Sequence, residues 1–112
     1  MPDGVIPEAV VVVTEALEGE SVSRWERLID DAVEMRPHRL IVDMRNSPLV
    51  DAAAIAALLR AHRAMMHAGG RLILRCPVAR VRRILNIARL DQVFDVDTEE
   101  SAAEPRLLSG GV

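Results

Sequence analysis

Two carboxylates, those of Asp43 and Asp51, flank one short loop and are the side chains best placed for chemistry. Residues 43–55 read Asp-Met-Arg-Asn-Ser-Pro-Leu-Val-Asp-Ala-Ala-Ala-Ile. Paired acids near a loop are typical of a phosphate-transfer or partner-contact neighbourhood. The same residues also suit structural roles, Asp43 as an acid at a strand end and Asp51 as a helix N-cap. Acid–base catalysis would need a substrate cleft and a partner that shifts a pKa; the sequence supplies neither, so we predict no enzyme.

The other nucleophilic and metal-binding side chains form no recognisable site. Ser47 carries the loop's one hydroxyl and is either a phosphate acceptor or a turn serine before Pro48. His62 and His67 are five residues apart on one expected helix and point to different faces. Cys76 ends an expected buried strand without a His or Asp arrangement beside it, so we interpret it as a core residue. We therefore expect no metal.

Composition narrows the class of protein. The 112 residues suit a single domain, and half of them are apolar. The net charge of −3, with no tyrosine and one residue each of phenylalanine and tryptophan, gives no support to nucleic-acid or membrane-surface binding. One cysteine fits a reducing compartment. No apolar run is long enough to cross a membrane, and no glycine-rich phosphate loop is present, so we expect a cytoplasmic protein without a cofactor.

Strand-like and helix-like segments alternate along the chain. The expected strands are Val10–Thr14, which reads as a continuous buried strand, Leu40–Met44, Leu72–Leu74 and Val93–Val96. Amphipathic helices are expected before Pro37, between Asp51 and Gly69, and over Val78–Ala88. This alternation predicts an α/β layer with a largely parallel sheet.

Local sequence signals indicate where the helices begin and end. Ser21 or Ser23 is expected to cap the first helix, and Ser23 with Glu26 has capping-box spacing. Gly69–Gly70 should end the second helix in a left-handed conformation. Asp97 or Thr98 could cap a short final helix through Glu104. We expect one domain over residues 8–104 with flexible termini at 1–7 and 105–112.

The loop resembles the phosphorylation loop of STAS domains, the family of bacterial anti-sigma-factor antagonists. Their usual pattern is Asp-Leu-Ser-Gly-x-x-x-Ile-Asp-Ser-Ser-Gly-Leu, in which the second serine of the pair accepts phosphate. The spacing from Asp43 to Asp51 fits that pattern without a gap. Ala52–Ala54 replaces Ser-Ser-Gly, so the resemblance places Ala53 at the phosphoacceptor position. A methyl group cannot accept phosphate.

The resemblance covers roughly residues 8–100. Residues 69–74 look like the Gly-Gly turn and strand that follow the family's switch helix, and Val78–Phe94 resembles its third-helix segment. Two further departures are Arg89, where a glycine is usual, and Asn46, which replaces the loop glycine. The resemblance implies a single STAS-like domain with a central mixed, mostly parallel sheet and helices packed largely on one face.

The resemblance also implies a function. An unphosphorylated domain of this family docks on an anti-sigma factor, often a serine kinase of the histidine-kinase-like ATPase fold, and phosphate blocks docking by adding charge. The implied partner-binding residues are Arg45, Asn46, Ser47, Asp51, Ala52, Ala53 and Ala54. The alternative is a scaffold or dimerising subunit of a larger assembly, such as a stressosome or a lipid-transport ABC complex. Arg80, Arg82, Arg83 and Arg89 form a basic patch, read as a solvated face or a site for an acidic partner.

Overall fold

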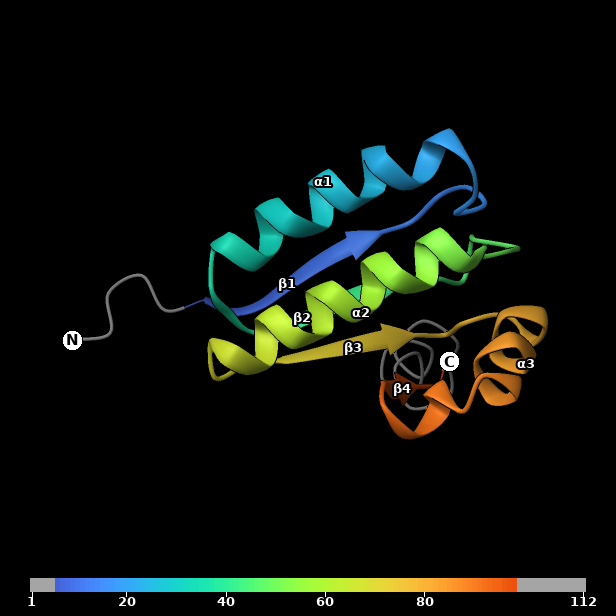
Figure 1. Ribbon diagram of the computed structural model, residues 1–112. Coiled ribbons are helices and arrows are strands. Elements are labelled where there is room, and N and C mark those ends of the chain that lie inside the picture. Colours follow the sequence, from blue (N-terminus) through green and yellow to red (C-terminus); the bar gives the residue numbers. More distant parts are fainter. Residues whose placement is uncertain (1–5, 99–112) are drawn as a thin grey trace, which may run out of the picture.

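The computed structural model describes residues 6–98. In chain order its elements are β1 (Ile6–Val12), α1 (Glu20–Glu34), β2 (Pro37–Asp43), α2 (Ala52–His67), β3 (Arg71–Arg75), α3 (Ala79–Ile87), the 3₁₀ turn η1 (Leu90–Gln92) and β4 (Asp95–Asp97) (Figure 1). Strands and helices alternate from β1 to α3, which confirms the predicted α/β class.

The four strands form one sheet in the order β1-β2-β3-β4. Ile41 of β2 stands opposite Val10 of β1 and Ile73 of β3, and Ile73 in turn stands opposite Asp95 of β4. Every pairing among the described residues is parallel. The described residues therefore form a fully parallel sheet, and no antiparallel strand of the expected mixed sheet lies among them. A helical segment carries the chain back between each pair of neighbouring strands, and such crossovers produce parallel neighbours.

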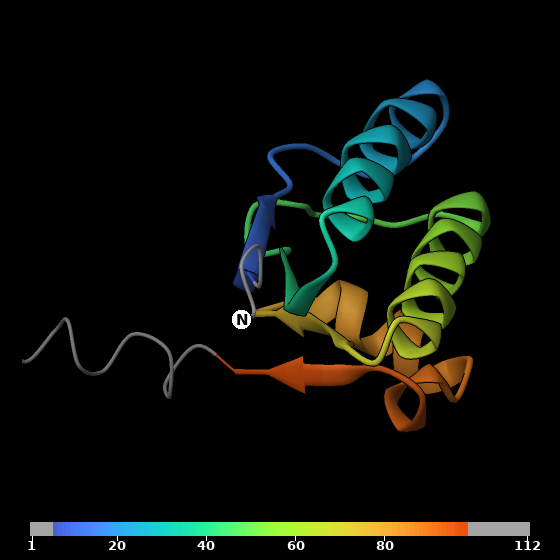
Figure 2. The same ribbon diagram turned by 90° about the vertical axis from the view of Figure 1, so that its left-hand side faces the viewer.

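Helices α1 and α2 cover the same face of the sheet, as Figure 2 shows. Strand side chains that point to this face, such as Leu40, Val42 and Leu74, are fully buried. They meet the apolar stripes of the two helices, including Ile29 and Leu58. The predicted packing of helices on one face is confirmed, because the 3–4 spacing of apolar residues gives each helix one face to bury.

The opposite face of the sheet is not covered by a helix in this part of the chain (Figure 2). Val10 and Val12 are 48% and 45% exposed, so the expectation of a continuously buried strand over Val10–Thr14 is wrong. β1 is an edge strand with one covered face, and alternate side chains of a strand point to opposite faces. β1 also begins at Ile6, before the expected domain start at residue 8.

The start of α1 differs from the sequence prediction. The helix begins at Glu20 with Gly19 as its N-cap, and Gly19 has a φ of 59° that favours glycine. The hydroxyl of Ser21 accepts from the backbone N–H of Glu18 at 3.1 Å, so Ser21 organises the preceding turn. The predicted Ser23 capping box is wrong, because the helix is already formed at Ser23.

The ends of the later elements follow the sequence more closely. Gly69, with a φ of 85°, has the predicted left-handed conformation after α2. Arg89 also has a positive φ, of 61°, at the position where the family usually has glycine. β4 spans Asp95–Asp97 instead of residues 93–96, because η1 extends the turn before it. The expected final helix through Glu104 lies outside the described residues.

Candidate functional site

Asp43 is the last residue of β2, and its side chain holds the start of the following loop through hydrogen bonds. Its side chain is largely buried, and Oδ1 accepts from the backbone N–H of Arg45 at 3.1 Å and from Arg45 Nε at 3.2 Å. The backbone N–H of Met44 donates to the carbonyl of Arg75 at 2.9 Å, which ties the loop to β3. Asp43 thus has the strand-end role that the sequence allowed.

Asp51 connects the beginnings of two helices. Its Oδ1 accepts from the backbone N–H of Ala54 at 2.8 Å, so Asp51 caps α2 as predicted. Its Oδ2 accepts from the backbone N–H of Gly19 at 3.0 Å, at the start of α1. The N–H of Gly19, followed by that of Ala54, holds the pKa of Asp51 below its ordinary value, because both bonds favour the charged carboxylate.

Backbone hydrogen bonds join the same two loops. The N–H of Leu17 donates to the carbonyl of Leu49 at 2.9 Å, and the N–H of Asp51 donates to the carbonyl of Leu17 at 3.0 Å. Leu17 and Val50 form an isolated parallel bridge. The turn before α1 therefore supports the loop, a contact that nothing in the local sequence pattern indicated.

The structure divides the sequence-predicted partner residues by exposure. Arg45, Asn46, Ala52 and Ala53 are exposed, and Asp51 is partly exposed. We call these five residues the loop surface. Ala53 is the second residue of α2, and its methyl group faces solvent.

Ser47 and Ala54 do not belong to this surface. Ser47 is 0% exposed, and its Oγ donates to the carbonyl of Leu49 at 3.4 Å. Ala54 is 1% exposed because the third residue of α2 turns toward the sheet. The resemblance implied that both residues bind the partner, and the structure buries both of them. The buried Ser47 hydroxyl is also inaccessible to a kinase in the folded chain.

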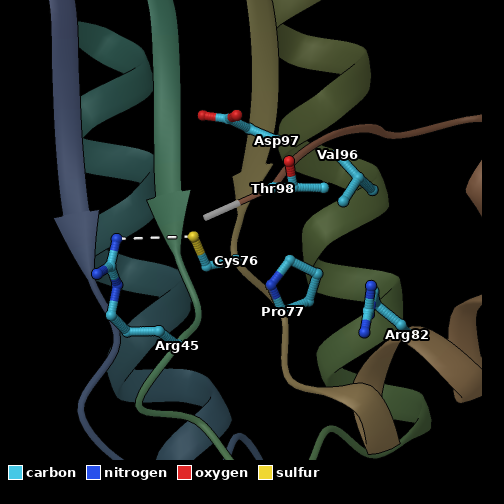
Figure 3. A pocket seen from close by; sticks show the side chains of 7 residues that line it. All are labelled: Arg45, Cys76, Pro77, Arg82, Val96, Asp97 and Thr98. Atoms are coloured by element: carbon cyan, nitrogen blue, oxygen red, sulfur yellow. Dashed lines mark hydrogen bonds between the residues drawn. The ribbon is translucent and has the colours of Figure 1, made fainter. Parts of the chain in front are cut away.

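Arg45 reaches from the loop toward β3. Its Nη2 lies 3.6 Å from Cys76 Sγ, at the edge of a cavity drawn in Figure 3. Cys76 is half-buried with a φ of 53°, and its backbone N–H donates to the carbonyl of Asp97. The prediction of a core cysteine is wrong, because the chain leaves the sheet at this residue.

His62 and His67 contact different groups. The ring of His62 packs edge-on against Phe94 with 5.6 Å between centroids, and His67 Nδ1 lies 3.0 Å from the carbonyl of Arg63. Residues 6–98 contain no cluster of three or more metal-binding side chains. Among the same residues, no helix has the length and apolar content needed to span a bilayer. The arginines at positions 80, 82, 83 and 89 are all exposed.

Two solved structures resemble this chain in fold. Both are of one Thermotoga maritima protein, a proposed anti-sigma factor antagonist. Its crystal structure matches with a TM-score of 0.77 and 15% identity, over 91% of this chain and 88% of that one. Its NMR structure matches with a TM-score of 0.73 and 16% identity, over 90% and 82% of the two chains. Identities this low establish the fold alone.

Comparison with curated protein sequences finds no match. The sequence model of the STAS domain, in contrast, matches residues 2–104. That match spans the loop and every helix and strand that the structure describes. The chain therefore belongs to the STAS domain family.

Proposed function

We propose that this chain is a non-catalytic, protein-binding STAS domain that acts as an anti-sigma factor antagonist in the cytoplasm of a bacterial cell. Its partner is an anti-sigma factor that is also a serine kinase with the histidine-kinase-like ATPase fold. Binding takes place at the loop surface. Phosphorylation at the position usual for the family does not regulate it.

The observation that carries this proposal is the exposed methyl group of Ala53. The family resemblance aligns this residue with the phosphoacceptor serine, and Ala53 faces solvent on the first turn of α2. The surrounding loop keeps the features that shape such a site, above all the Asp51 cap. The remaining hydroxyl of the loop, on Ser47, is buried. This surface can therefore meet a partner but has no accessible group to accept phosphate.

Rigidity of the loop also supports partner binding. Asp51 bonds to the starts of both α1 and α2, and Leu17 pairs with the backbone of the loop. A surface held in one conformation loses little entropy when it binds, which favours affinity. Asp51 serves this purpose while the residue remains partly exposed.

Calorimetric titration against each purified anti-sigma factor of the serine-kinase type from the same cell tests the function. We expect one of them to bind, and Arg45→Ala and Asn46→Ala to weaken that binding. Arg80→Ala and Arg83→Ala are matched controls, since they remove exposed charges from α3, outside the loop surface. Lack of binding to all of these factors, or a larger effect of the α3 variants, would refute the assignment.

A scaffold role is the second candidate. The half-exposed Val10 and Val12 on edge strand β1 favour it, because exposed apolar strand surface suits association with another chain. Light scattering coupled to size-exclusion chromatography distinguishes the two candidates. A scaffold subunit should self-associate, and Val10→Thr together with Val12→Thr should abolish the association.

A further inference from the structure

A cavity of about 430 Å³ lies beside the loop surface at the carboxyl ends of three neighbouring strands. Arg45 follows β2, Cys76 and Pro77 follow β3, and the end of β4 supplies the opposite wall (Figure 3). Ligands of open α/β sheets bind outside the carboxyl ends of the strands, which is the side of the sheet where this cavity lies. The strand order β1-β2-β3-β4 has no reversal, so the rule supports the side of the sheet alone. The volume is within the range of small-molecule sites.

The charges around the cavity favour an anion. Arg82, on α3, lines the cavity, and within residues 6–98 no carboxylate lies at ion-pair distance from its guanidinium. Arg45 adds a second guanidinium at the other side; its Nε is bonded to Asp43 Oδ1 at 3.2 Å, while its Nη2 lies at the cavity edge, 3.6 Å from Cys76 Sγ. Figure 3 shows the two side chains on opposite sides of Cys76 and Pro77. Guanidinium groups match the geometry of carboxylate and phosphate oxygens.

The carboxylate in the lining does not cancel this preference. Asp97 Oδ2 lies 3.3 Å from Arg75 Nε, so Asp97 is already paired with a different arginine. In Figure 3 its carboxylate also points away from Arg82. Pro77 and Val96 supply apolar parts of the wall.

We propose that this cavity is an anion-binding pocket that accepts one carboxylate or phosphate group, with Arg82 as its main cation and Arg45 as the second. The group can come from a small free anion or from an acidic side chain of a bound protein. The second source would extend the loop surface, because Arg45 belongs to both sites. The basic patch seen in the sequence thus separates into Arg82, which faces the pocket, and Arg80 and Arg83, which do not line it.

NMR titration of the full chain tests the pocket, with inorganic phosphate in one arm and a blocked peptide containing a single aspartate in the other. Sodium chloride keeps the ionic strength constant. We expect saturable shifts of the Cys76 and Thr98 amides. Arg82→Gln should weaken the apparent affinity by roughly tenfold or more, as the loss of a charge-assisted bond predicts. Arg83→Gln removes the same charge from the next residue of α3 and should bind like the wild type.

The two arms separate the possible sources. Tighter binding of the peptide, with the same dependence on Arg82, indicates a protein carboxylate. Tighter binding of phosphate with that dependence indicates a small anion. Absence of saturation in both arms, or equal weakening by Arg82→Gln and Arg83→Gln, would overturn the pocket. Neither titration contains an anti-sigma factor, so a negative result here leaves the proposed partner binding intact.

Discussion

Substituting aspartate for Ala53 should separate the stability of the fold from its binding function. The new carboxylate would stand on the first turn of α2, where the helix dipole favours negative charge by about 0.3–1 kcal/mol. Aspartate has a poorer helix propensity than alanine by several tenths of a kcal/mol, and the neighbouring Asp51 carboxylate repels it. Because Ala53 is exposed, no core contact is lost. We expect the melting temperature to change by less than about 4 °C.

Binding should respond much more strongly. If Ala53 lies under the partner, the added charge loses its water without gaining a counter-charge, at a cost of at least about 3 kcal/mol. At 1.4 kcal/mol per factor of ten, this lowers the affinity by roughly a hundredfold or more. The aspartate reproduces part of the charge that phosphate adds in serine-containing relatives.

Ala64→Asp is the matched control, on the exposed surface of the last turn of the same helix. There the dipole disfavours the charge, so this variant should melt lower by roughly 4–8 °C, as expected for a loss of about 1 kcal/mol. Its affinity should match the wild type. The assay is calorimetric affinity for the anti-sigma factor beside a thermal melt. If Ala53→Asp changes neither the affinity nor the melting temperature, residue 53 lies outside the interface and the loop-surface assignment is refuted.

Three further predictions concern the switch position, the Asp51 cap and the close contact at Gly70. Incubated with its partner kinase and ATP, the wild type should keep its intact mass, whereas Ala53→Ser should gain one phosphate; a stoichiometric phosphate on the wild type would contradict the unregulated domain. The pKa of Asp51 is lower in the folded chain than its ordinary value of 3.8, so its stabilising effect is complete above that value and is lost as the pH falls through the folded pKa. Between about pH 5 and about pH 2 the melting temperature of the wild type should therefore fall further than that of Asp51→Asn. An equal fall in both proteins would argue against the cap. Gly70→Ala would place a Cβ 2.8 Å from both Met65 Cε and the carbonyl oxygen of Pro37, and should destabilise the fold by roughly 1–3 kcal/mol in urea unfolding; an unchanged midpoint would show that this contact relaxes freely.

Much of the fold could be predicted from local sequence. The spacing of apolar residues indicated three helices, and the alternation with β-branched segments indicated a parallel α/β layer. Asp51 was recognisable as an N-cap, and Gly69 as a left-handed helix end, because both signals act within one helical turn. The motif around residues 43–55 indicated the family, which the sequence model of the STAS domain confirms.

Errors arose where the exposure of a residue or the start of an element depends on residues that are distant in the sequence. Val10 and Val12 read as buried, but β1 is an edge strand with one open face. Ser47 reads as a phosphate acceptor or a turn serine, and neither interpretation indicated that it is fully buried. The capping box at Ser23 has the right spacing, yet α1 had already begun at Glu20.

The sequence by itself determined which elements form and that residue 53 has no hydroxyl, because periodicity and side-chain chemistry are local properties. Only the tertiary structure decided which residues meet. The second bond of Asp51, to Gly19, joins positions 32 residues apart in the chain. The cavity between Arg45 and Arg82 draws on the ends of three strands and on α3. Such contacts depend on strand order and on the angle at which each crossover returns, and both are set by the packing of the whole domain.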